Sequence, residues 1–326
     1  MHNNISRPSY QHFVGVDVGK FSLVFCRHGE RQCVEYPNSP EGIRDFFSSH
    51  SAWLQNGFFI VDTTGNWERS LIESLLAEGI PVHRTDGRRV KSFARSLGKL
   101  AKTDSIDAGI LARYGHDRHQ DLFLCELADE KVSILQTLVT RRSQLVIYAK
   151  EEKQRLSGKV DDRMHELICY NLDQLNAQIE KLNLEIEECI DSDVKMKLKS
   201  QIMQESAGIG SKTSAFLLAQ LPELGYLNCK EIAALSGLAP HARDSGQMNA
   251  RRTTYGGRQD VKSVMFLAAI NAVRCKDSTL REFYMQLISK GKTKRCALIA
   301  VARKMITILN AKIRDTLYPK IKLLSR

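Results

Sequence analysis

Four aspartates in the first third of the chain could together perform metal-assisted chemistry. Asp17 lies within the apolar stretch FVGVD, where an ionised side chain is costly unless it is paired or metal-bound. Asp62 ends the apolar stretch GFFIVD, and Asp104 and Asp107 follow in KTDSID. Carboxylate oxygens suit Mg²⁺ or Mn²⁺, and two such ions about 4 Å apart assist in-line phosphoryl transfer. If the fold brings the four carboxylates together, they predict a divalent-metal site.

Each aspartate also has a purely structural interpretation. Asp104 and Asp107 are three residues apart, so on a helix they share a face and repel one another. A helix N-terminus would offset this repulsion, because Asp at the cap and at the third position binds free N–H groups. Asp17 and Asp62 could be turn residues at strand ends. The occurrence of all four in a basic chain favours the metal site.

The elements expected around these residues form an α/β domain. Apolar stretches predict two strands joined by a tight turn within 12–29 and further strands within 57–62 and 81–86. Helical spacing of apolar residues predicts helices within 41–54 and 67–80. Strands that alternate with helices in this way are typical of an α/β fold. The basic segment that follows is expected to become helical near Asp104.

A helical segment is expected from about 127 to 200. Its apolar residues follow a heptad spacing and are Leu172, Leu175, Ile179, Leu182, Ile186 and Cys189. Such a seam fits a long helical hairpin, an intermolecular coiled coil, or a helix packed on its own domain. The last part, 201–326, is expected to be mainly helical with a loop-rich centre. Within it, SAGIGSKTSAFLLAQL resembles half of a helix-hairpin-helix, in which a helix N-terminus beside Lys212 suits a phosphate.

The composition favours nucleic acid as a partner. The 326 residues carry a net charge of +11 and the pI is about 9.3, which favours a polyanion. No apolar run reaches the roughly 18 residues that span a bilayer, and the polar N-terminus predicts no signal peptide, so a membrane is disfavoured. The eight cysteines form no CxxC pair. They predict reduced, mostly buried thiols of a cytoplasmic protein, without disulfides or zinc.

Two basic segments are candidate phosphate contacts. The first precedes Asp104 and contains Arg88, Arg89, Lys91, Arg95, Lys99 and Lys102. It could equally be the solvated face of a basic helix. The second is a polar loop that contains Arg243, Arg251, Arg252 and Arg258. Basic side chains of this kind would contact the nucleic-acid backbone rather than read bases.

Several stretches occur in an order that resembles a known family. They are VGVDVGK, VDTTGNWERSL, RRVKSFARSLGKLAKTDSIDAGILARYG, AGIGSKTSAFLLAQLPELG, IAALSGLAPHARDSG, GGR and VARKMITILNA. The chain is similar over nearly its whole length to the DEDD-type insertion-sequence transposases. This is insertion-sequence family one hundred and ten, which includes pilin-gene inverting recombinases. The resemblance implies an α/β RNase H-like (RuvC-like) N-terminal domain (1–126), a helical coiled-coil insert (127–200) and a mainly α-helical C-terminal transposase domain (201–326) with the serine loop.

The resemblance also implies the roles of particular residues. The family's acidic set falls on Asp17, Asp62, Asp104 and Asp107 as ligands of Mg²⁺ or Mn²⁺. The second position is usually Glu, so Asp62 departs from the pattern, and Glu68 is a less favoured substitute. The family's serine nucleophile falls on Ser245 in RDSG, which the sequence alone would interpret as a turn residue. Ser245 would attack a DNA phosphodiester and form a covalent serine–DNA intermediate.

The implied partners are DNA, a structured guide RNA transcribed from the element, and further copies of the chain as a homodimer or homotetramer. The implied location is the bacterial cytoplasm, with association to the nucleoid when DNA is bound. Two other hypotheses remain open at this point. One is a structure-selective, metal-dependent nuclease that uses water as its nucleophile. The other is a degenerate transposase, altered at Asp62, that only binds nucleic acid.

Overall fold

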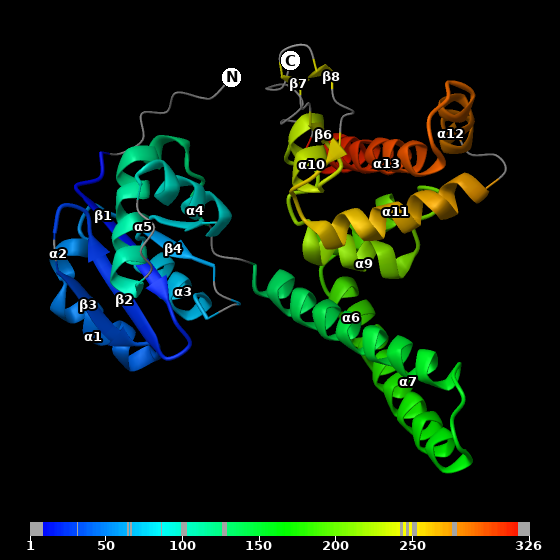
Figure 1. Cartoon of the computed structure of the whole chain (residues 1–326), viewed down its shortest axis with the longest axis horizontal. Helices are drawn as coiled ribbons and strands as arrows, with labels where there is room; N and C mark the ends of the chain where they lie inside the picture. The colour runs from blue at the N-terminus through cyan, green and yellow to red at the C-terminus, as the bar shows by residue number, and fades with distance from the viewer. Residues whose placement is uncertain are drawn as a thin grey trace. The chain divides into compact units, whose positions relative to one another are not determined.

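The computed structural model describes residues 9–30, 32–63, 65, 67–85, 87–98, 103–125, 129–241, 244–245, 248–249, 253–275 and 279–318. These residues belong to two compact units, one within 1–127 and the other within 128–326 (Figure 1). The first unit contains a mixed β-sheet and the second consists mostly of helices. The prediction of an α/β N-terminal part followed by a helical part is confirmed at this level.

The sheet of the first unit has five strands in the order β3-β2-β1-β4-β5. Strands β1, β2 and β3 pair antiparallel, whereas β1, β4 and β5 pair parallel. The strands span His12–Val18 (β1), Ser22–Arg27 (β2), Cys33–Pro37 (β3), Gly57–Asp62 (β4) and Val82–Thr85 (β5). Sequence analysis did not identify β3. Its short, partly charged sequence CVEYP lacks the apolar run that predicted the other strands.

Helices cover both faces of this sheet. Helices α1 (Pro40–Ser49), α2 (Ser51–Leu54) and α3 (Arg69–Ala77) pack against the face formed by alternate residues of β1 and β4, such as Val14 and Val61. On the opposite face, α5 (Asp104–Arg118) and α4 (Gly87–Ser96) pack against Phe13, Phe58 and Ile60. Residues at i and i+2 of a strand share a face. The face that α5 covers therefore includes Gly15, Asp17 and Asp62.

The second unit begins with a long helical hairpin of α6 (Glu130–Leu156) and α7 (Asp162–Asp191), which extends away from the other helices of the unit (Figure 1). Leu172 and Ile179 of the heptad seam are buried against Leu145 and Ala149 of α6. The far end of the seam, at Ile186, joins the main core of this unit. The seam is therefore filled within the chain, as the hairpin interpretation predicts.

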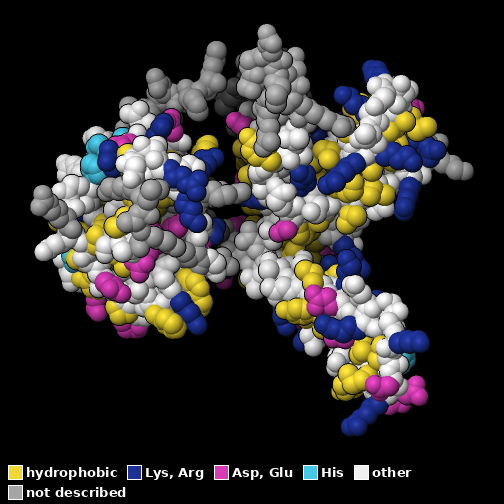
Figure 2. Space-filling model, in the orientation of Figure 1, with side chains coloured by type: hydrophobic (Ala, Val, Ile, Leu, Met, Phe, Trp, Pro, Cys, Tyr) yellow, Lys and Arg dark blue, Asp and Glu magenta, His cyan; other side chains and the backbone are white. Residues whose placement is uncertain are grey.

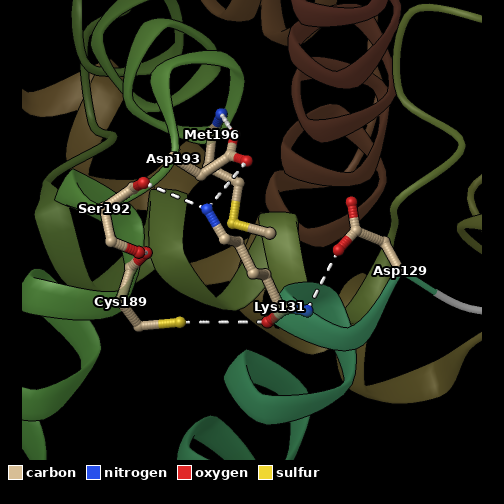
Figure 3. Close-up of polar contacts among 6 residues, drawn as sticks. All are labelled: Asp129, Lys131, Cys189, Ser192, Asp193 and Met196. Atoms are coloured by element: carbon tan, nitrogen blue, oxygen red, sulfur yellow. Dashed lines mark hydrogen bonds and ion pairs between the residues drawn. The ribbon is translucent and has the colours of Figure 1, made fainter.

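Polar contacts fix the base of the hairpin to α8 (Val194–Gln204) (Figure 3). Asp129 caps α6 by accepting from Lys131 N at 3.0 Å, and Asp193 caps α8 by accepting from Met196 N at 2.8 Å. The Lys131 ammonium donates to Ser192 O at 3.1 Å and lies 3.7 Å from Asp193 Oδ2. The bond from Met196 N and the nearby Lys131 charge hold the pKa of Asp193 below its usual value. These contacts set the direction in which α8 leaves the hairpin.

The main core of the second unit lies among α6, α8 and the helices that follow. These helices are α9 (Ser211–Gln220), α10 (Cys229–Leu235), α11 (Gln259–Arg274), α12 (Thr279–Ser289) and α13 (Lys294–Leu317). The Gly-Ile-Gly turn before α9 packs directly on α11. A Cβ at Gly208 would lie 2.3 Å from Ala268 O, and φ at Gly208 is +83°. The glycine is therefore required by close packing, whether or not the turn binds phosphate.

The prediction that the cysteines are mostly buried and form no disulfide is wrong. Cys26 and Cys33 face each other directly in the β2–β3 pair, 4.5 Å apart at Cα, and form a disulfide. A cross-strand pair cannot be identified from a CxxC pattern, because its spacing depends on the turn between the strands. The other cysteines are not fully buried, and Cys229 and Cys275 are exposed. Separately, within the described residues no helix is both long enough and apolar enough to span a membrane.

Candidate active site

The first unit brings Asp17 and Asp62 to the same edge of the sheet. Strands β1 and β4 are parallel, and their last recorded pair is Val16 with Val61. The next residue in each strand is an aspartate, so the two lie side by side. Neighbouring strands are about 4.8 Å apart, and residues in register point to the same face. Both carboxylates are partly exposed at the carboxyl ends of their strands.

Helix α5 delivers the other two aspartates to this edge. A Cβ at Gly15 would lie 2.1 Å from Ala108 O and 2.3 Å from Ala112 N, so α5 packs on the bare backbone of β1. A Cβ at Gly115, one turn beyond Ala112, would lie 3.6 Å from Phe13, which precedes Gly15 in β1. The helix therefore runs antiparallel to β1 and β4, and its N-terminus lies near the ends of these strands. That N-terminus carries Asp104 and Asp107.

The N-terminal cap of α5 differs from the prediction. Thr103, not Asp104, is the cap, and its hydroxyl accepts from Ile106 N at 3.3 Å. Asp104 is the first residue of the helix and is exposed, whereas Asp107 is partly buried in the first turn. Because the cap position is already taken by threonine, capping does not explain why both aspartates are there. The helix dipole still favours their negative charge.

Asp62 and Asp107 form a pair of like charges. Burial raises the pKa of Asp62, and the neighbouring Asp107 carboxylate raises it further. The Thr63 N–H, which donates to Asp62 Oδ1 at 2.8 Å, and the Lys91 ammonium oppose this rise. An ionised carboxylate that faces another carboxylate is a candidate for cation binding. Asp107 therefore lies close enough to Asp62 to act on it electrostatically.

The remaining members of the acidic set are Asp17 and Asp104. Asp17 is beside Asp62 by strand register, and Asp104 is exposed one turn before Asp107. No three acidic, histidine or cysteine side chains among the described residues lie close enough together to hold a metal ion. The hard oxygen atoms of the facing pair nevertheless fit Mg²⁺ or Mn²⁺ in chemical character. If a metal is bound, Asp62 and Asp107 would hold it, with Asp17 beside them.

Sequence analysis missed Thr85, which borders the acidic pair. Thr85 is paired in register with Asp62 and is only 1% exposed. Its Oγ1 is buried and has no hydrogen-bond partner among the described residues. A buried hydroxyl without a partner costs about 1–3 kcal/mol. The sequence gives no signal for such a buried hydroxyl, because threonine is common in strands.

Glu68, the less favoured substitute, has a different environment. It precedes α3 and is 1% exposed. Arg84 of β5 donates to its Oε1 through Nε at 3.0 Å and through Nη2 at 2.5 Å. Its charge also contributes to the raised pKa of Asp62, as the weakest of the recorded causes. Glu68 is therefore already neutralised by a guanidinium, unlike Asp62.

The predicted nucleophile, Ser245, lies in the second unit. It belongs to β7 (Asp244–Ser245), which pairs antiparallel with β8 (Met248–Asn249) in a two-stranded hairpin. The structure describes the backbone of Ser245 but not its side chain. The predicted phosphate contacts Arg243, Arg251 and Arg252 lie outside the described residues, as do Lys99 and Lys102 of the first basic segment. Arg258 donates to both carboxylate oxygens of Glu223 at 2.6 Å, so its charge is paired within the fold.

Helix α4 presents the first basic segment to solvent. Arg89, Lys91 and Arg95 are exposed, whereas Val90 and Phe93 pack against the sheet-facing core. The side chain of Arg88 is not among those described. An open groove of 580 Å³ between α4 and the end of α5 is lined by Arg89 and Arg118, together with Asp121. The described basic side chains of α4 are thus exposed to solvent.

Lys212, at the start of α9, occupies a less basic setting. It lines a 380 Å³ groove together with Arg142, Glu180, Glu187 and Asp191. A more strongly basic surface that sequence analysis did not select follows α12. Lys290, Lys292, Lys294 and Arg295 are all exposed there, and Figure 2 shows Lys and Arg side chains gathered around α12. The run KGKTKR was a visible signal for this surface.

Comparisons with known proteins find similarity to transposases and to gene-inverting proteins. Residues 14–164 match a family described as transposase, and residues 200–285 match the transposase IS116/IS110/IS902 family. The pilin gene-inverting proteins of Moraxella bovis and Moraxella lacunata are each 25% identical over 317 residues, which cover 93% of this chain and 96% of theirs. An insertion element IS110 uncharacterized protein of Streptomyces coelicolor is 30% identical over 118 residues, 36% of this chain and 29% of that protein.

These matches define a transposase-class DNA recombinase. The chain belongs to the IS110 family of transposases, as the resemblance in its sequence motifs implied.

Proposed function

We propose that this recombinase cuts and rejoins DNA through Ser245, with a divalent metal held at Asp62 and Asp107. Asp17 and Asp104 complete the acidic set, and the N-terminal unit is RNase H-like. The observation that carries the proposal is the like-charged pair formed by Asp62, at the carboxyl end of β4, and Asp107, in the first turn of α5. The mixed sheet, with three antiparallel strands followed by two parallel ones, supports the RNase H-like fold.

The chemistry divides between the two units. A divalent cation supplies Lewis-acid stabilisation of charge on a phosphate and favours deprotonation of an attacking hydroxyl. The Ser245 Oγ attacks the phosphorus, a serine–phosphate ester forms, and one DNA P–O bond breaks. The departing DNA oxygen takes up a proton, while the serine proton is released. A hydroxyl of a second DNA strand then attacks the ester, which restores Ser245 and joins the new strands.

The proposal includes a structured guide RNA and a homodimer or homotetramer. The net charge of +11 and the exposed basic face of α4 support binding to nucleic-acid backbones. A protein that contacts phosphates without reading bases would need sequence information from elsewhere, and base pairing by an RNA can supply it. By analogy with the name of the Moraxella relatives the reaction is a DNA inversion, and by analogy with the matched families it is a transposition.

The decisive experiment is capture of the covalent intermediate. The protein would be purified with the RNA that copurifies, then incubated with DNA flanking its own gene and Mn²⁺. We expect a denaturation-resistant DNA adduct that maps to a peptide containing Ser245 and is absent in Ser245→Ala. Hydrolysed DNA without an adduct would instead indicate a nuclease. Absence of any metal-dependent turnover would leave only the binding-protein hypothesis.

A further inference from the structure

Two lysines and two tyrosines from three parts of the second unit form one cluster. Lys195 and Lys199 lie one turn apart on α8, Tyr226 precedes α10, and Tyr318 follows α13. Lys195 Nζ donates to Tyr226 Oη at 3.0 Å, and Tyr226 Oη donates to Tyr318 Oη at 2.7 Å. The two rings are tilted by 32° to one another with centroids 4.4 Å apart, and each ammonium lies 5.2–5.7 Å from both of them.

The turn that carries Tyr226 is held rigidly. Asn310 of α13 is 1% exposed and binds both sides of the turn. Its Oδ1 accepts from Gly225 N at 2.8 Å, and its Nδ2 donates to Leu227 O at 2.7 Å. The tyrosine is thus presented in a fixed position, with 43% of its surface exposed. Fixed donors bind a ligand with less loss of conformational entropy than flexible surface side chains do.

The positive charge of the cluster is not balanced within the described part of the chain. Neither lysine forms an ion pair there, although Lys199 is only 8% exposed and donates to Leu224 O at 3.3 Å. Glu223 is the acidic group that acts on Lys199, but it is already paired in bidentate fashion with Arg258. Contacts with aromatic faces offset part of the cost of this charge. An anion would offset more of it.

The cluster shifts the pKa values of its two lysines in opposite directions. Burial lowers the pKa of Lys199. Hydrogen bonds to Tyr226 and Tyr318 raise the pKa of Lys195, which stays charged. The cluster therefore offers an anion the ammonium of Lys195 and the O–H of Tyr318, because the single O–H of Tyr226 is donated to Tyr318.

We propose that Lys195, Lys199, Tyr226 and Tyr318 form a binding site for a backbone phosphate of nucleic acid. This inference rests on the proposed action on DNA and RNA, but it is independent of the acidic pair and of Ser245. The ligand chemistry follows from the donors, because a phosphodiester carries one negative charge and several acceptor oxygens. The open position of Tyr226 suits a polymer that continues past the site. Lys195 supplies the charged contact, and Tyr226 orients it.

The test is the salt dependence of binding by the full chain. The probes are a duplex DNA and a single-stranded RNA of unrelated sequence, titrated at several salt concentrations. We expect Lys195→Met to weaken binding several-fold and to reduce the slope of log K against log salt by about 0.7–0.9, the loss of one phosphate contact. Lys197→Met is the matched control, because Lys197 lies on the same helix and is paired with Asp191 at 3.1 Å. It should leave both quantities unchanged.

A second variant separates binding from a purely structural role. Tyr226→Phe keeps the ring and its cation–π contacts but removes the hydroxyl beside Lys195. We expect about threefold weaker binding with an unchanged salt slope. If Lys195→Met and Tyr226→Phe lower the melting temperature yet bind like Lys197→Met, the cluster only joins helices and the inference is wrong. If the unaltered protein binds neither probe, the proposed function fails as well.

Discussion

Two carboxylates of the first unit, Glu68 and Asp62, lie near each other in sequence but differ in what surrounds them. Glu68 is almost fully buried and is bound twice by the guanidinium of Arg84. Asp62 is partly buried, and the ionisable side chain whose charge acts on it most strongly is another carboxylate, Asp107. The pair of Glu68 with Arg84 neutralises a buried charge, whereas the pair of Asp62 with Asp107 brings two negative charges together. Because folding alone does not reward the second arrangement, we infer that Asp62 is kept for chemistry.

The largest expected effect follows from removing the charge of Asp62. Asp62→Asn keeps the shape of the side chain but removes a metal ligand. We expect Mn²⁺-dependent strand cleavage in single-turnover assays to fall by about 10³-fold, since ligand-assisted charge stabilisation supplies several kcal/mol. Asp45→Asn, an exposed change on α1, is the control and should cleave normally. Cleavage by Asp62→Asn within tenfold of the unaltered protein would remove Asp62 from the site.

The next effect tests the paired carboxylate. Glu68→Gln leaves the Arg84 guanidinium without its charged partner. We expect the free energy of unfolding, measured with urea, to fall by about 1–2 kcal/mol, less than for a fully buried pair because Arg84 is 48% exposed. Glu73→Gln is the control. Its pair with Arg69 is more than half exposed on both sides and is worth about 0.5 kcal/mol or less.

The two variants should also differ in activity. Cleavage by the folded fraction of Glu68→Gln is expected to stay within threefold of normal. A loss as large as that of Asp62→Asn would mean that Glu68, rather than Asp62, provides the family's usual glutamate. This outcome would reverse the assignment of the two carboxylates.

Much of the first unit could be predicted from local pattern. The apolar runs around Val14 and Phe59 identified β1 and β4, and the break at Gly79 marked the end of the helix before β5. Asp17 and Asp62 were chosen because carboxylates are rare in such runs. The strand β3 was missed because its pairing depends on β2, which is a tertiary contact rather than a local preference.

The details of the site could not be predicted in the same way. The cap at Thr103 rather than Asp104 depends on the backbone conformation of a single residue. The unpartnered hydroxyl of Thr85 depends on register and burial, which sequence spacing does not reveal. The cluster around Tyr226 joins residues up to 123 positions apart, from Lys195 to Tyr318, so no motif contains it.

A smaller effect is expected from a change at Thr85, which lies beside Asp62 in the neighbouring strand. Thr85→Val replaces the buried hydroxyl by a methyl group of similar size. We expect the metal-free protein to gain about 1 kcal/mol in unfolding free energy, because a buried polar atom without a partner is removed. Thr85→Ser, which keeps the hydroxyl, should show no gain. If Thr85→Val is instead less stable than Thr85→Ser, the Thr85 hydroxyl has a hydrogen-bond partner in solution that the described contacts do not include.

The smallest effect is the pH dependence of the Asp62 contribution. Burial and Asp107 raise the pKa of Asp62 in the folded protein above its ordinary value of 3.8. At pH values between the pKa of Asp62 in the unfolded chain and its pKa in the folded protein, the folded protein keeps a proton that the unfolded chain releases. The free energy of unfolding therefore falls as pH rises through this range and is constant above it. Asn does not titrate. The stability of Asp62→Asn relative to the unaltered, metal-free protein should therefore rise from about pH 4 towards neutral pH and then level off.

The size and origin of this difference can both be measured. We expect only a few tenths of a kcal/mol, because the carboxylate is partly exposed and water screens it. In an Asp107→Asn background the like charge is absent. The pH range over which the stability changes should then narrow, while the rise in the pKa of Asp62 that burial causes persists. Urea titrations of the four proteins at several pH values form a double-mutant cycle for the pair. If the cycle shows no coupling at neutral pH, Asp62 and Asp107 do not interact, and the contrast with Glu68 and Arg84 loses its basis.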